Sequence, residues 1–484
     1  MLEFSILFII PLITAVLCYF LKSIRLQYIY SLSAGLLHLI FTLLIFIGWY
    51  KPNLPFFFSF DSLSNLFLLI LSNVYFWVVL VSFSYLKRPV NSKAQDGKKY
   101  YFLLLNFYLF ANTSAILSNH FGMYWVSAEA TTLSIAPLIY YYRNEEALEA
   151  MWKYLFLVSV GIAFAFIGIL FLTLSANGTP LESHQLFYTE FIKNASKLNP
   201  VWLKASFIFI FVGLSTKIGI APMHYGDVDA TSNSPSPIAA LMSGSLRITA
   251  LIGVLRIFQI VRPTTTFEFA KIILIIGGLL SILVAFIFMF KVNNYKRMLA
   301  YSSVEHLGII VLGIGIGGLA FVGAMYHIAY NSLNKLVLFF TAGNIHRVFK
   351  TREIKDVSSV LKILPWTGWL FMLSFFAISA IPPFGIFFSE LMIFQGILFS
   401  DRPWLLAITM FMLLFIFINM GKTIFNMLYG GKENEAITNE NESFEVIHFA
   451  TIVLLILLIT IAVISPDILH ENILNISKDF GFSL

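Results

Sequence analysis

The sequence has few charged residues and almost no cysteine. Asp, Glu, Lys and Arg make up 12% of the 484 residues, whereas hydrophobic residues make up 59%. Soluble domains carry about a quarter charged residues, so this composition excludes an ordinary globular enzyme and indicates a polytopic all-α membrane protein. The single cysteine, Cys18, excludes an internal disulfide framework, a CxxC pair and a cysteine-ligated iron–sulfur cluster.

The chain also lacks the marks of a soluble catalytic or nucleic-acid-binding protein. It shows no hydrolytic triad, phosphate loop or metal-ligand spacing, and no polar segment is long enough for an enzymatic domain. His224, Asp227 and Asp229 are close in sequence but lie in a Gly- and Pro-containing segment, 223–235, which we expect to be a loop without a metal. We therefore expect no cofactor and no metal, and we attribute the net charge of +6 to membrane topology rather than to nucleic acid.

Apolar segments of about 20 residues, the length that crosses the hydrocarbon core, fill the chain. We expect about fourteen spans: 4–21, 28–49, 63–86, 101–119, 122–142, 153–175, 202–222, 236–260, 271–291, 298–315, 319–345, 364–398 (broken), 403–429 and 446–465. The first apolar run lacks the cleavage site of a secretory signal, so it is expected to remain as a helix.

Loop charges predict the orientation of these spans. The loops on one side carry 18 Lys and Arg residues and those on the other side carry 8. The positive-inside rule makes the first side cytoplasmic, which leaves both termini outside. Within the polar segments, 176–201 is expected to hold a short surface helix, and the acidic loop 430–445 is expected to be mobile.

A lysine and a helix break interrupt the span that ends at Pro222. Lys217 lies at membrane depth, where a charge costs at least ~2.5–3.5 kcal/mol, and Gly219 and Pro222 follow it. A similar break, 382–385, precedes Glu390. Paired broken spans that carry ionisable groups indicate an inverted-repeat transporter with sites near the middle of the membrane.

Further ionisable residues recur within or beside the expected spans. The candidates are Glu129, Lys217, His224, Arg247, Glu305, His306, His327, Lys335 and Glu390. We expect Lys217 to pair with Glu129 and Lys335 with Glu390, because an opposite charge stabilises both members at depth. A buried lysine holds its proton less tightly, so a row of such pairs, bridged by histidine and water, is able to relay protons.

Structural roles are the alternative for each of these residues. The acids and lysines would then form ion pairs or subunit contacts, and His306 and His327 would be satisfied interior histidines. Glu305 would form a salt bridge at a helix end. Arg256 is expected to extend from its helix end toward the interface.

Several segments together resemble a known family. WVSAEATTLSIAPLIYYYRNEEALEAMWKYL, STKIGIAPMH, SPSPIAALMSG, VNNYKRMLAYSSVEHLGII, HIAYNSLNKLVLFFTAGN and PPFGIFFSELMIF are similar to the antiporter-like membrane subunits of respiratory complex I and group 4 hydrogenases, in particular the F-type component of hydrogenase-4. The resemblance covers about residues 60–430. It implies fourteen helices, two inverted five-helix repeats, broken helices seven and twelve, and proton translocation.

The resemblance also divides the chain and assigns relay residues. The division it implies is 1–100 as a three-helix segment, 101–260 and 261–430 as the two repeats, and 431–484 as a polar loop with a C-terminal helix. The relay residues it implies are Glu129, Lys217, His306, Lys335 and Glu390.

Two departures from the family pattern affect the middle of the relay. The family usually reads PLHTWLPDAHSEAPSP after helix seven, where this chain reads PMHYGDVDATSNSPSP with Thr231 in place of the second histidine. The position in helix eight that often holds lysine is Ile248. Its neighbour Arg247 points about 100° away on an α-helix, so it substitutes only if the backbone adjusts.

These observations favour a proton-translocating subunit of a multisubunit oxidoreductase, without a redox centre of its own. Its expected partners are other membrane and peripheral subunits, protons and lipid, in a bacterial or archaeal cytoplasmic membrane. A second hypothesis is an energising subunit of an inorganic-carbon transporter or of a multisubunit cation/proton antiporter. A third is a scaffold that has lost conduction.

Overall fold

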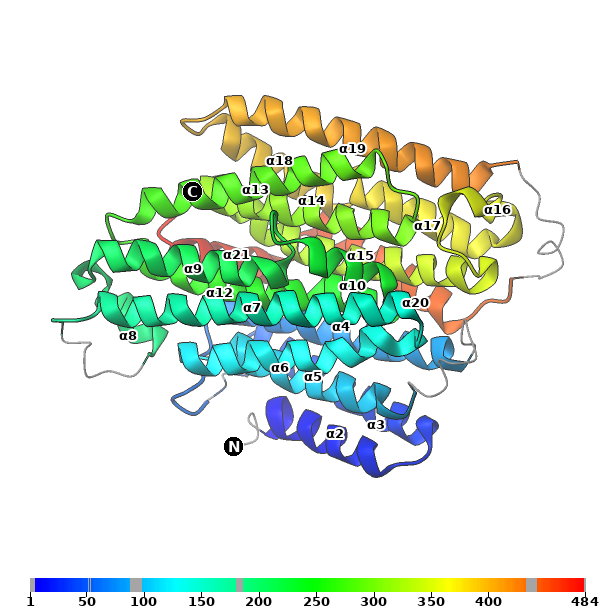
Figure 1. The fold of residues 1–484 in the computed structure, drawn as a ribbon, viewed down its shortest axis with the longest axis horizontal. Coiled ribbons are helices and arrows are strands. Elements are labelled where there is room, and N and C mark those ends of the chain that lie inside the picture. Colours follow the sequence, from blue (N-terminus) through cyan, green and yellow to red (C-terminus); the bar gives the residue numbers. More distant parts are fainter. Residues whose placement is uncertain are drawn as a thin grey trace.

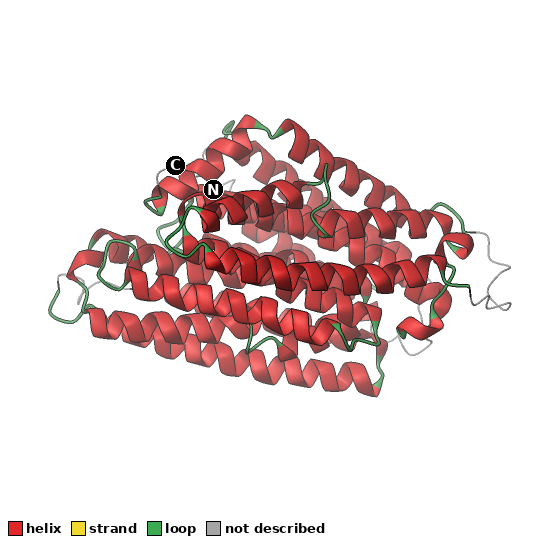
Figure 2. Ribbon diagram, turned by 90° about the horizontal axis from the view of Figure 1, so that it is seen from above, coloured by secondary structure: helices red, strands yellow, loops and turns green. Residues whose placement is uncertain are grey.

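The chain folds into a bundle of helices that run side by side along its longest dimension (Figure 1). The computed structural model describes residues 5–50, 52, 54–87, 98–179, 186–431 and 442–482. Within these ranges the β-type pairing consists of isolated bridges between loops, and Figure 2 shows helices throughout the bundle. The predicted all-α class is confirmed.

The principal helices follow one another with short connections. Their bounds are α2 (Ile10–Phe20), α3 (Ile24–Phe46), α4 (Ser62–Lys87), α5 (Tyr101–Leu117), α6 (Phe121–Ile139), α7 (Glu145–Ser175), α8 (Tyr188–Lys193), α9 (Pro200–Ile218), α10 (Tyr225–Asn233), α11 (Ser236–Leu241), α12 (Arg247–Val261), α13 (Phe267–Met289), α14 (Tyr295–Ile316), α15 (Gly318–Phe349), α16 (Val360–Ile363), α17 (Pro365–Ile378), α18 (Gly385–Leu398), α19 (Trp404–Tyr429), α20 (Val446–Ile464) and α21 (Asp467–Asp479). Among the described residues, ten helical stretches are long and apolar enough to cross a membrane, and three shorter helices are apolar. The count of fourteen spans, the inverted repeats and the domain division stay predictions.

Two spans are broken where the sequence predicts it. The helix α9 ends at Gly219, whose φ of +85° ends the helix in a left-handed conformation that glycine adopts without strain. The chain then turns and resumes as α10. The second break separates α17 from α18 and contains Pro382 and Pro383. Both predicted breaks are confirmed.

Segment 223–235, predicted as a loop, is instead mostly the helix α10. Its sequence YGDVDATSN is too polar to indicate a buried helix, yet residues 226–232 are all buried. Protein groups rather than lipid surround it, so its polar side chains are stabilised by neighbours that local sequence does not reveal.

The interior of the bundle is formed by α11, α12, α14 and α15. The stretch from α11 through α12 is wholly buried and α14 nearly so, whereas α7, α13 and α19 bury less than half of their apolar stretch. The outer helices therefore present apolar side chains to lipid, and the helices that carry most of the ionisable residues lie inside.

The connecting segments hold one confirmed and one missed helix. The expected surface helix in 176–201 is α8. Of the acidic loop 430–445, residues 432–441 lie outside the described residues. Beyond the last predicted span, the amphipathic helix α21 buries Leu469, Ile473 and Ile476. Their spacing of four and three residues is a helical signal, and α21 is a helix beyond those we expect from the apolar spans.

Candidate ion-translocation site

The first broken helix buries its lysine against neutral oxygens. Lys217, in the last turn of α9, is fully buried. Its ammonium donates hydrogen bonds to the Ala128 carbonyl and the Thr131 hydroxyl, and to Thr132 Oγ1 at 2.9 Å. All three acceptors belong to α6. The ammonium is therefore held by dipoles rather than by a carboxylate.

Lys217 and Glu129, which we expect to pair as opposite charges, make no direct contact. Glu129 lies on α6, but its Oε1 accepts a hydrogen bond of 2.7 Å from Ser159 Oγ on α7, and its Oε2 has no hydrogen-bond partner. Successive helical residues point about 100° apart, so Glu129 faces α7 while the Ala128 carbonyl faces α9. The lysine and the glutamate still interact electrostatically.

The predicted pair of Lys335 and Glu390 is also not formed as a contact. Lys335, fully buried on α15, donates a hydrogen bond of 2.5 Å to Ser302 Oγ on α14 and interacts electrostatically with Glu305. Glu305 is buried within α14, which excludes the alternative of an exposed salt bridge at the helix end.

Glu390 instead joins a cluster with two histidines. Its Oε1 lies 3.9 Å from His306 Nδ1, and the same ring nitrogen lies 3.0 Å from His327 Nε2. Ser389 Oγ lies 3.0 Å from the other ring nitrogen of His327. The three helices α14, α15 and α18 thus contribute one connected set of proton-exchanging groups.

A small cavity adjoins this cluster. It measures about 50 Å³ and is lined by Glu305, His306, Ser379 and Glu390 together with apolar side chains. This volume is large enough for water, and its polar lining supplies hydrogen-bond partners. His306, His327 and Glu390 place their ligating atoms within 4.8 Å of one another, a spacing that would also suit a metal ion and that the sequence pattern does not predict.

An unpredicted ion pair lies buried between α10 and α12. Arg247 Nη2 lies 2.5 Å from Asp227 Oδ2, and both side chains are almost completely inaccessible to solvent. The same nitrogen donates a hydrogen bond of 3.1 Å to Thr231 Oγ1. A π-helical turn, Met242–Leu246, immediately precedes Arg247 and interrupts the α-helical register.

The other two predicted loop residues do not join Asp227. His224 is buried against aromatic rings, including Phe288 and Tyr301. Asp229 instead lies at a polar pocket, where its carboxylate contacts Lys153 Nζ at 3.3 Å and Arg297 Nη2 at 3.0 Å. In the described part of the chain, these three residues form no common ligand set.

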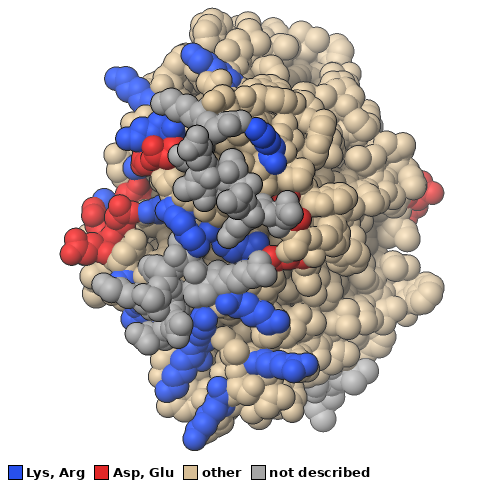
Figure 3. All heavy atoms as spheres, turned by 90° about the vertical axis from the view of Figure 1, so that its right-hand side faces the viewer, with Lys and Arg blue, Asp and Glu red and all other residues tan. Residues whose placement is uncertain are grey.

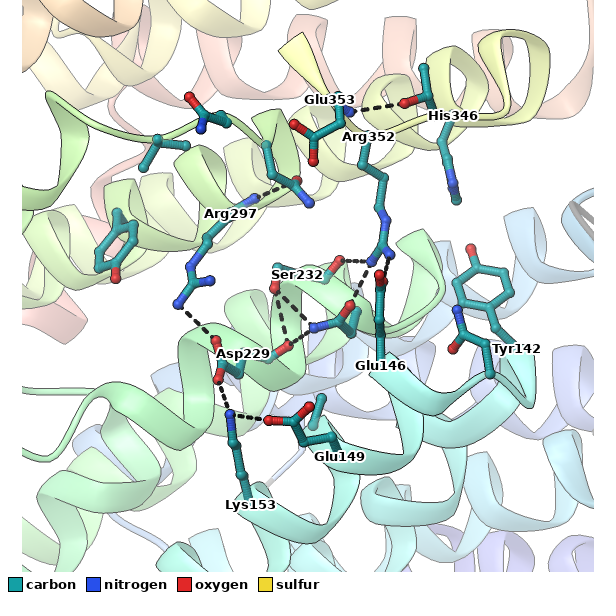
Figure 4. A pocket seen from close by; sticks show the side chains of 18 of the residues that line it. Tyr142, Glu146, Glu149, Lys153, Asp229, Ser232, Arg297, His346, Arg352 and Glu353 are labelled. Carbon is teal, nitrogen blue, oxygen red and sulfur yellow. Dashed lines mark hydrogen bonds and ion pairs between the residues drawn. The ribbon is translucent and has the colours of Figure 1, made fainter. Parts of the chain in front are cut away.

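The polar pocket has a volume of about 1130 Å³. Figure 4 shows charged side chains converging on it from α7, α10, α14 and the segment after α15. Arg352 binds Glu146 and also donates a hydrogen bond of 2.6 Å to Asn233 Oδ1. We call this pocket the vestibule, and Asp229, two residues from Asp227, lies in its lining.

Arg256 lies toward the end of α12 and its side chain is buried. It forms a two-pronged ion pair with Asp61, in the connection before α4, one contact being 2.9 Å. Burial alone would raise the pKa of Asp61, but the Arg256 charge and hydrogen bonds outweigh it and lower the pKa. The arginine ties α12 to the start of α4 and lies apart from the candidate relay.

Buried lysines and acids beside two broken helices define an ion-transport class of multi-pass membrane protein. The chain belongs to the family described as NADH:quinone oxidoreductase/Mrp antiporter, transmembrane, whose profile matches residues 118–417. It is thus an antiporter-like membrane subunit, as the motifs predict.

Two relatives illustrate the similarity. A hydrogenase-4 component F homolog of Methylacidiphilum infernorum (isolate V4) is 34% identical over 387 residues, which cover 78% of this chain and 81% of the relative. A D-type Na⁺/H⁺ antiporter subunit of Alkalihalophilus pseudofirmus is 25% identical, over 73% of this chain and 70% of the relative.

Solved structures share the fold at lower identity. A chain of the membrane-bound sulfane sulfur reductase, an archaeal respiratory membrane complex, matches with a TM-score of 0.87 at 22% identity, covering 99% of this chain and 97% of that one. A chain of the Mrp complex from Dietzia sp. DQ12-45-1b matches with a TM-score of 0.84 at 15% identity, covering 99% and 98%.

Proposed function

We propose that this subunit translocates protons through its buried ionisable residues, as part of a multisubunit oxidoreductase of the hydrogenase-4 or NADH-quinone dehydrogenase type. The observation that carries the proposal is the chain of proton-exchanging groups near both helix breaks. The proposed relay consists of Glu129, Lys217, His306, His327, Lys335 and Glu390, with Glu305, Arg247 and His224 as candidate relay or gate residues.

The first half stores a proton on Lys217. Three neutral oxygens hold the ammonium, so a change in the charge of the nearby Glu129 shifts the balance between the protonated and neutral amine. Glu129 retains a carboxylate oxygen without a partner, which is free to receive a proton.

The second half passes protons between histidines. His306 and His327 share a hydrogen bond of 3.0 Å, and imidazole accepts a proton at one nitrogen and releases it from the other. Glu390 and Glu305 flank a cavity that has room for water, so a proton that reaches His306 has an exit through carboxylates and water.

The orientation follows from charge. Figure 3 views the end of the bundle that lies on the right in Figure 1, where Lys and Arg side chains gather. We assign this end to the cytoplasm and both termini to the outside, in a bacterial or archaeal cytoplasmic membrane. The vestibule lined by Lys153, Arg297 and Arg352 then opens toward the cytoplasm.

The driving reaction would come from partner subunits. The composition offers no cysteine-ligated redox centre, so electron transfer in neighbouring subunits would supply the free energy that changes the charge states of the relay. The similarity to hydrogenase-4 component F supports such partners.

A second candidate is coupling of protons to another cation or to inorganic-carbon uptake. The similarity to an Na⁺/H⁺ antiporter subunit favours the cation alternative. Copurification after mild solubilisation separates the cases, because hydrogenase or quinone-reducing partners support the first candidate and antiporter-type partners support the second.

The direct test replaces Lys217 with alanine in the assembled complex reconstituted into proteoliposomes, with internal acidification as the measurement. We expect proton translocation per assembled complex to fall at least tenfold. Lys422→Ala is the matched control, because Lys422 lies on α19 with an exposed side chain. Unchanged translocation in Lys217→Ala would refute the relay.

A further inference from the structure

The short helix α10 carries two polar faces that point to different places. Asp227 and Thr231, four residues apart, both contact Arg247 in the interior. Asp229, Ser232 and Asn233 line the vestibule instead (Figure 4). Residues four apart share a helix face, whereas Asp229 lies about 200° from Asp227. A single element thus connects the aqueous pocket with the buried ion pair.

The buried pair is incompletely satisfied. Arg247 Nε and Nη1 and Asp227 Oδ1 have no hydrogen-bond partner, so the contact between the two side chains runs through Nη2 and Oδ2 alone. Desolvating two charges costs several kcal/mol, which a structural ion pair recovers only with additional hydrogen bonds. The free donors and acceptors instead leave this pair able to exchange partners.

The pair also lies electrostatically between the two lysine sites. Tyr154, a buried residue of α7 whose hydroxyl has no hydrogen-bond partner, interacts with both Glu129 and Asp227. Arg247 in turn interacts with Lys335. Through Tyr154 and Arg247, the pair therefore shares electrostatic neighbours with both lysine sites.

The Asp227 carboxylate also packs against the first helix break. A methyl group added at Gly219 would meet Asp227 Oδ2 at 2.8 Å. Gly219 follows Lys217 by two residues, so the glycine that ends α9 leaves room for this carboxylate. The break and the ion pair form one unit.

We propose that Asp227 is the proton-carrying link between the two halves of the relay and that Arg247 is the residue that positions its charge. This inference rests on the proposed function. The residue that carries the proton between the two halves is then Asp227 on α10. Arg247 on α12 contributes a fixed positive charge where a proton-exchanging base would otherwise stand.

The proposed step balances as one proton transfer. A proton arriving through vestibule water binds one Asp227 oxygen, which neutralises the carboxylate and weakens its attraction to Arg247. Arginine keeps its own proton, so the guanidinium acts only through its charge. When the guanidinium turns from Asp227, its charge repels the Lys335 ammonium more strongly, and Lys335 gives its proton to the Glu305 carboxylate. The neutral Lys335 amine then takes the Asp227 proton through water, which leaves Asp227 ionised and restores its pair with Arg247.

The test measures proton translocation in the assembled complex in proteoliposomes, normalised to assembled complex, for Asp227→Asn, Arg247→Gln and Arg247→Lys. We expect losses of at least tenfold for the first two and activity within about twofold to threefold of the original for Arg247→Lys, which keeps the charge. Asp61→Asn is the matched control, because it removes a second Arg–Asp pair, that with Arg256, which lies apart from the candidate relay. It should lower thermal stability and leave normalised translocation within twofold.

The Lys217→Ala variant separates the middle link from the relay as a whole. If it abolishes translocation while Asp227→Asn and Arg247→Gln leave it unchanged, the middle link is refuted and the relay stands. If Lys217→Ala also leaves translocation unchanged, both are refuted. If Arg247→Gln does not assemble, the Arg247→Lys variant decides the role of the charge. An Arg247→Lys complex that assembles but loses as much translocation as Asp227→Asn would show that Arg247 does not act by positioning the charge of Asp227.

Discussion

Lys217 and Thr132 are joined by a hydrogen bond of 2.9 Å between the last turn of α9 and the middle of α6. Together with the Thr131 hydroxyl and the Ala128 carbonyl, Thr132 gives the ammonium a shell of neutral acceptors. A carboxylate in direct contact with the ammonium would make Lys217 hold its proton more tightly. The neutral shell therefore suits a lysine that must release its proton.

Replacing Thr132 with valine tests this shell, because valine keeps the shape and removes the acceptor. Hydrogen bonds to charged groups contribute about 1.5–3 kcal/mol, and two acceptors remain, so we expect the free energy of unfolding to fall by about 1 kcal/mol. Translocation should fall several-fold, less than for Lys217→Ala. Thr173→Val is the control, because the Thr173 hydroxyl bonds only to the carbonyl of Leu170 in its own exposed helix. Equal effects of both variants on translocation would contradict a role of the shell.

Replacing His306 or His327 with glutamine interrupts the histidine pair without removing hydrogen-bonding capacity. Glutamine does not take up and release protons near physiological pH, so we expect proton translocation per assembled complex to fall at least tenfold in each variant. The measurement is acidification of proteoliposomes. His38→Gln is the control, since His38 is equally buried and binds Ser72 and Thr113 far from the cluster. A similar loss in His38→Gln would indicate a general structural effect.

Replacing Gly219 with alanine has two energetic costs, the strain of a positive φ and a steric contact with Asp227. The same replacement at Gly48 has only the first cost. Gly219 and Gly48 have nearly the same φ, +85° and +82°, but an added methyl group meets Asp227 at Gly219 and nothing within 4 Å at Gly48. Alanine in this conformation costs about 1–2 kcal/mol at either position. We expect Gly219→Ala to lower the thermal unfolding midpoint more than Gly48→Ala and to reduce translocation, whereas Gly48→Ala leaves translocation unchanged. Equal midpoint shifts would show that the contact with Asp227 has no energetic weight.

The carboxylate of Glu442 predicts a pH-dependent contribution to stability. It lies outside the spans and accepts hydrogen bonds from the Trp366 amide at 2.7 Å, the Thr367 hydroxyl at 2.5 Å and His448 Nε2 at 2.9 Å. Burial alone would raise its pKa, but the His448 and Thr367 hydrogen bonds outweigh it and lower the pKa of Glu442. A lowered pKa in the folded state means that ionised Glu442 stabilises the fold above the unfolded pKa of about 4.3, and that this contribution is lost as the pH falls through the folded pKa.

The matching measurement compares thermal unfolding of the original protein and Glu442→Gln in detergent from pH 7 to pH 3.5. We expect the variant to unfold at lower temperature at pH 7, with a constant difference down to about pH 5 that shrinks below it. Glu268→Gln is the control, because Glu268 is exposed and pairs only with Lys271. A difference that grows as the pH falls would contradict the assigned sign.

The helix breaks and the depths of the charges could be predicted from local sequence, but the contacts of those charges could not. Glycine, proline and a membrane-embedded charge each give a strong local signal in the sequence. These signals identify Gly219, the 382–385 segment and Lys217. The residues that contact Lys217 depend on how α6 is rotated about its axis, which the sequence does not show. A step of one residue along α6 separates Ala128, whose carbonyl binds Lys217, from Glu129, which binds Ser159.

The middle of the candidate relay was the hardest part to predict. On a regular α-helix Arg247 would face away unless the backbone adjusts, and a π-helical turn does interrupt the helix immediately before it. Asp227 had no usable local signal, because α10 is short and polar and its sequence is typical of a loop. Such a helix is stable only through tertiary packing, which composition and periodicity do not contain.

Because α10 has only nine residues, a length of about 13 Å, it behaves as one stiff piece. On its outer side, Asp229 forms ion pairs with Lys153 of α7 and Arg297 of α14. On its inner side, Asp227 forms an ion pair with Arg247 of α12. Neither attachment can shift alone. We therefore expect that salt, or a neighbouring subunit that competes for Lys153 and Arg297, shifts α10 and with it the contact between Asp227 and Arg247, without a separate signalling element.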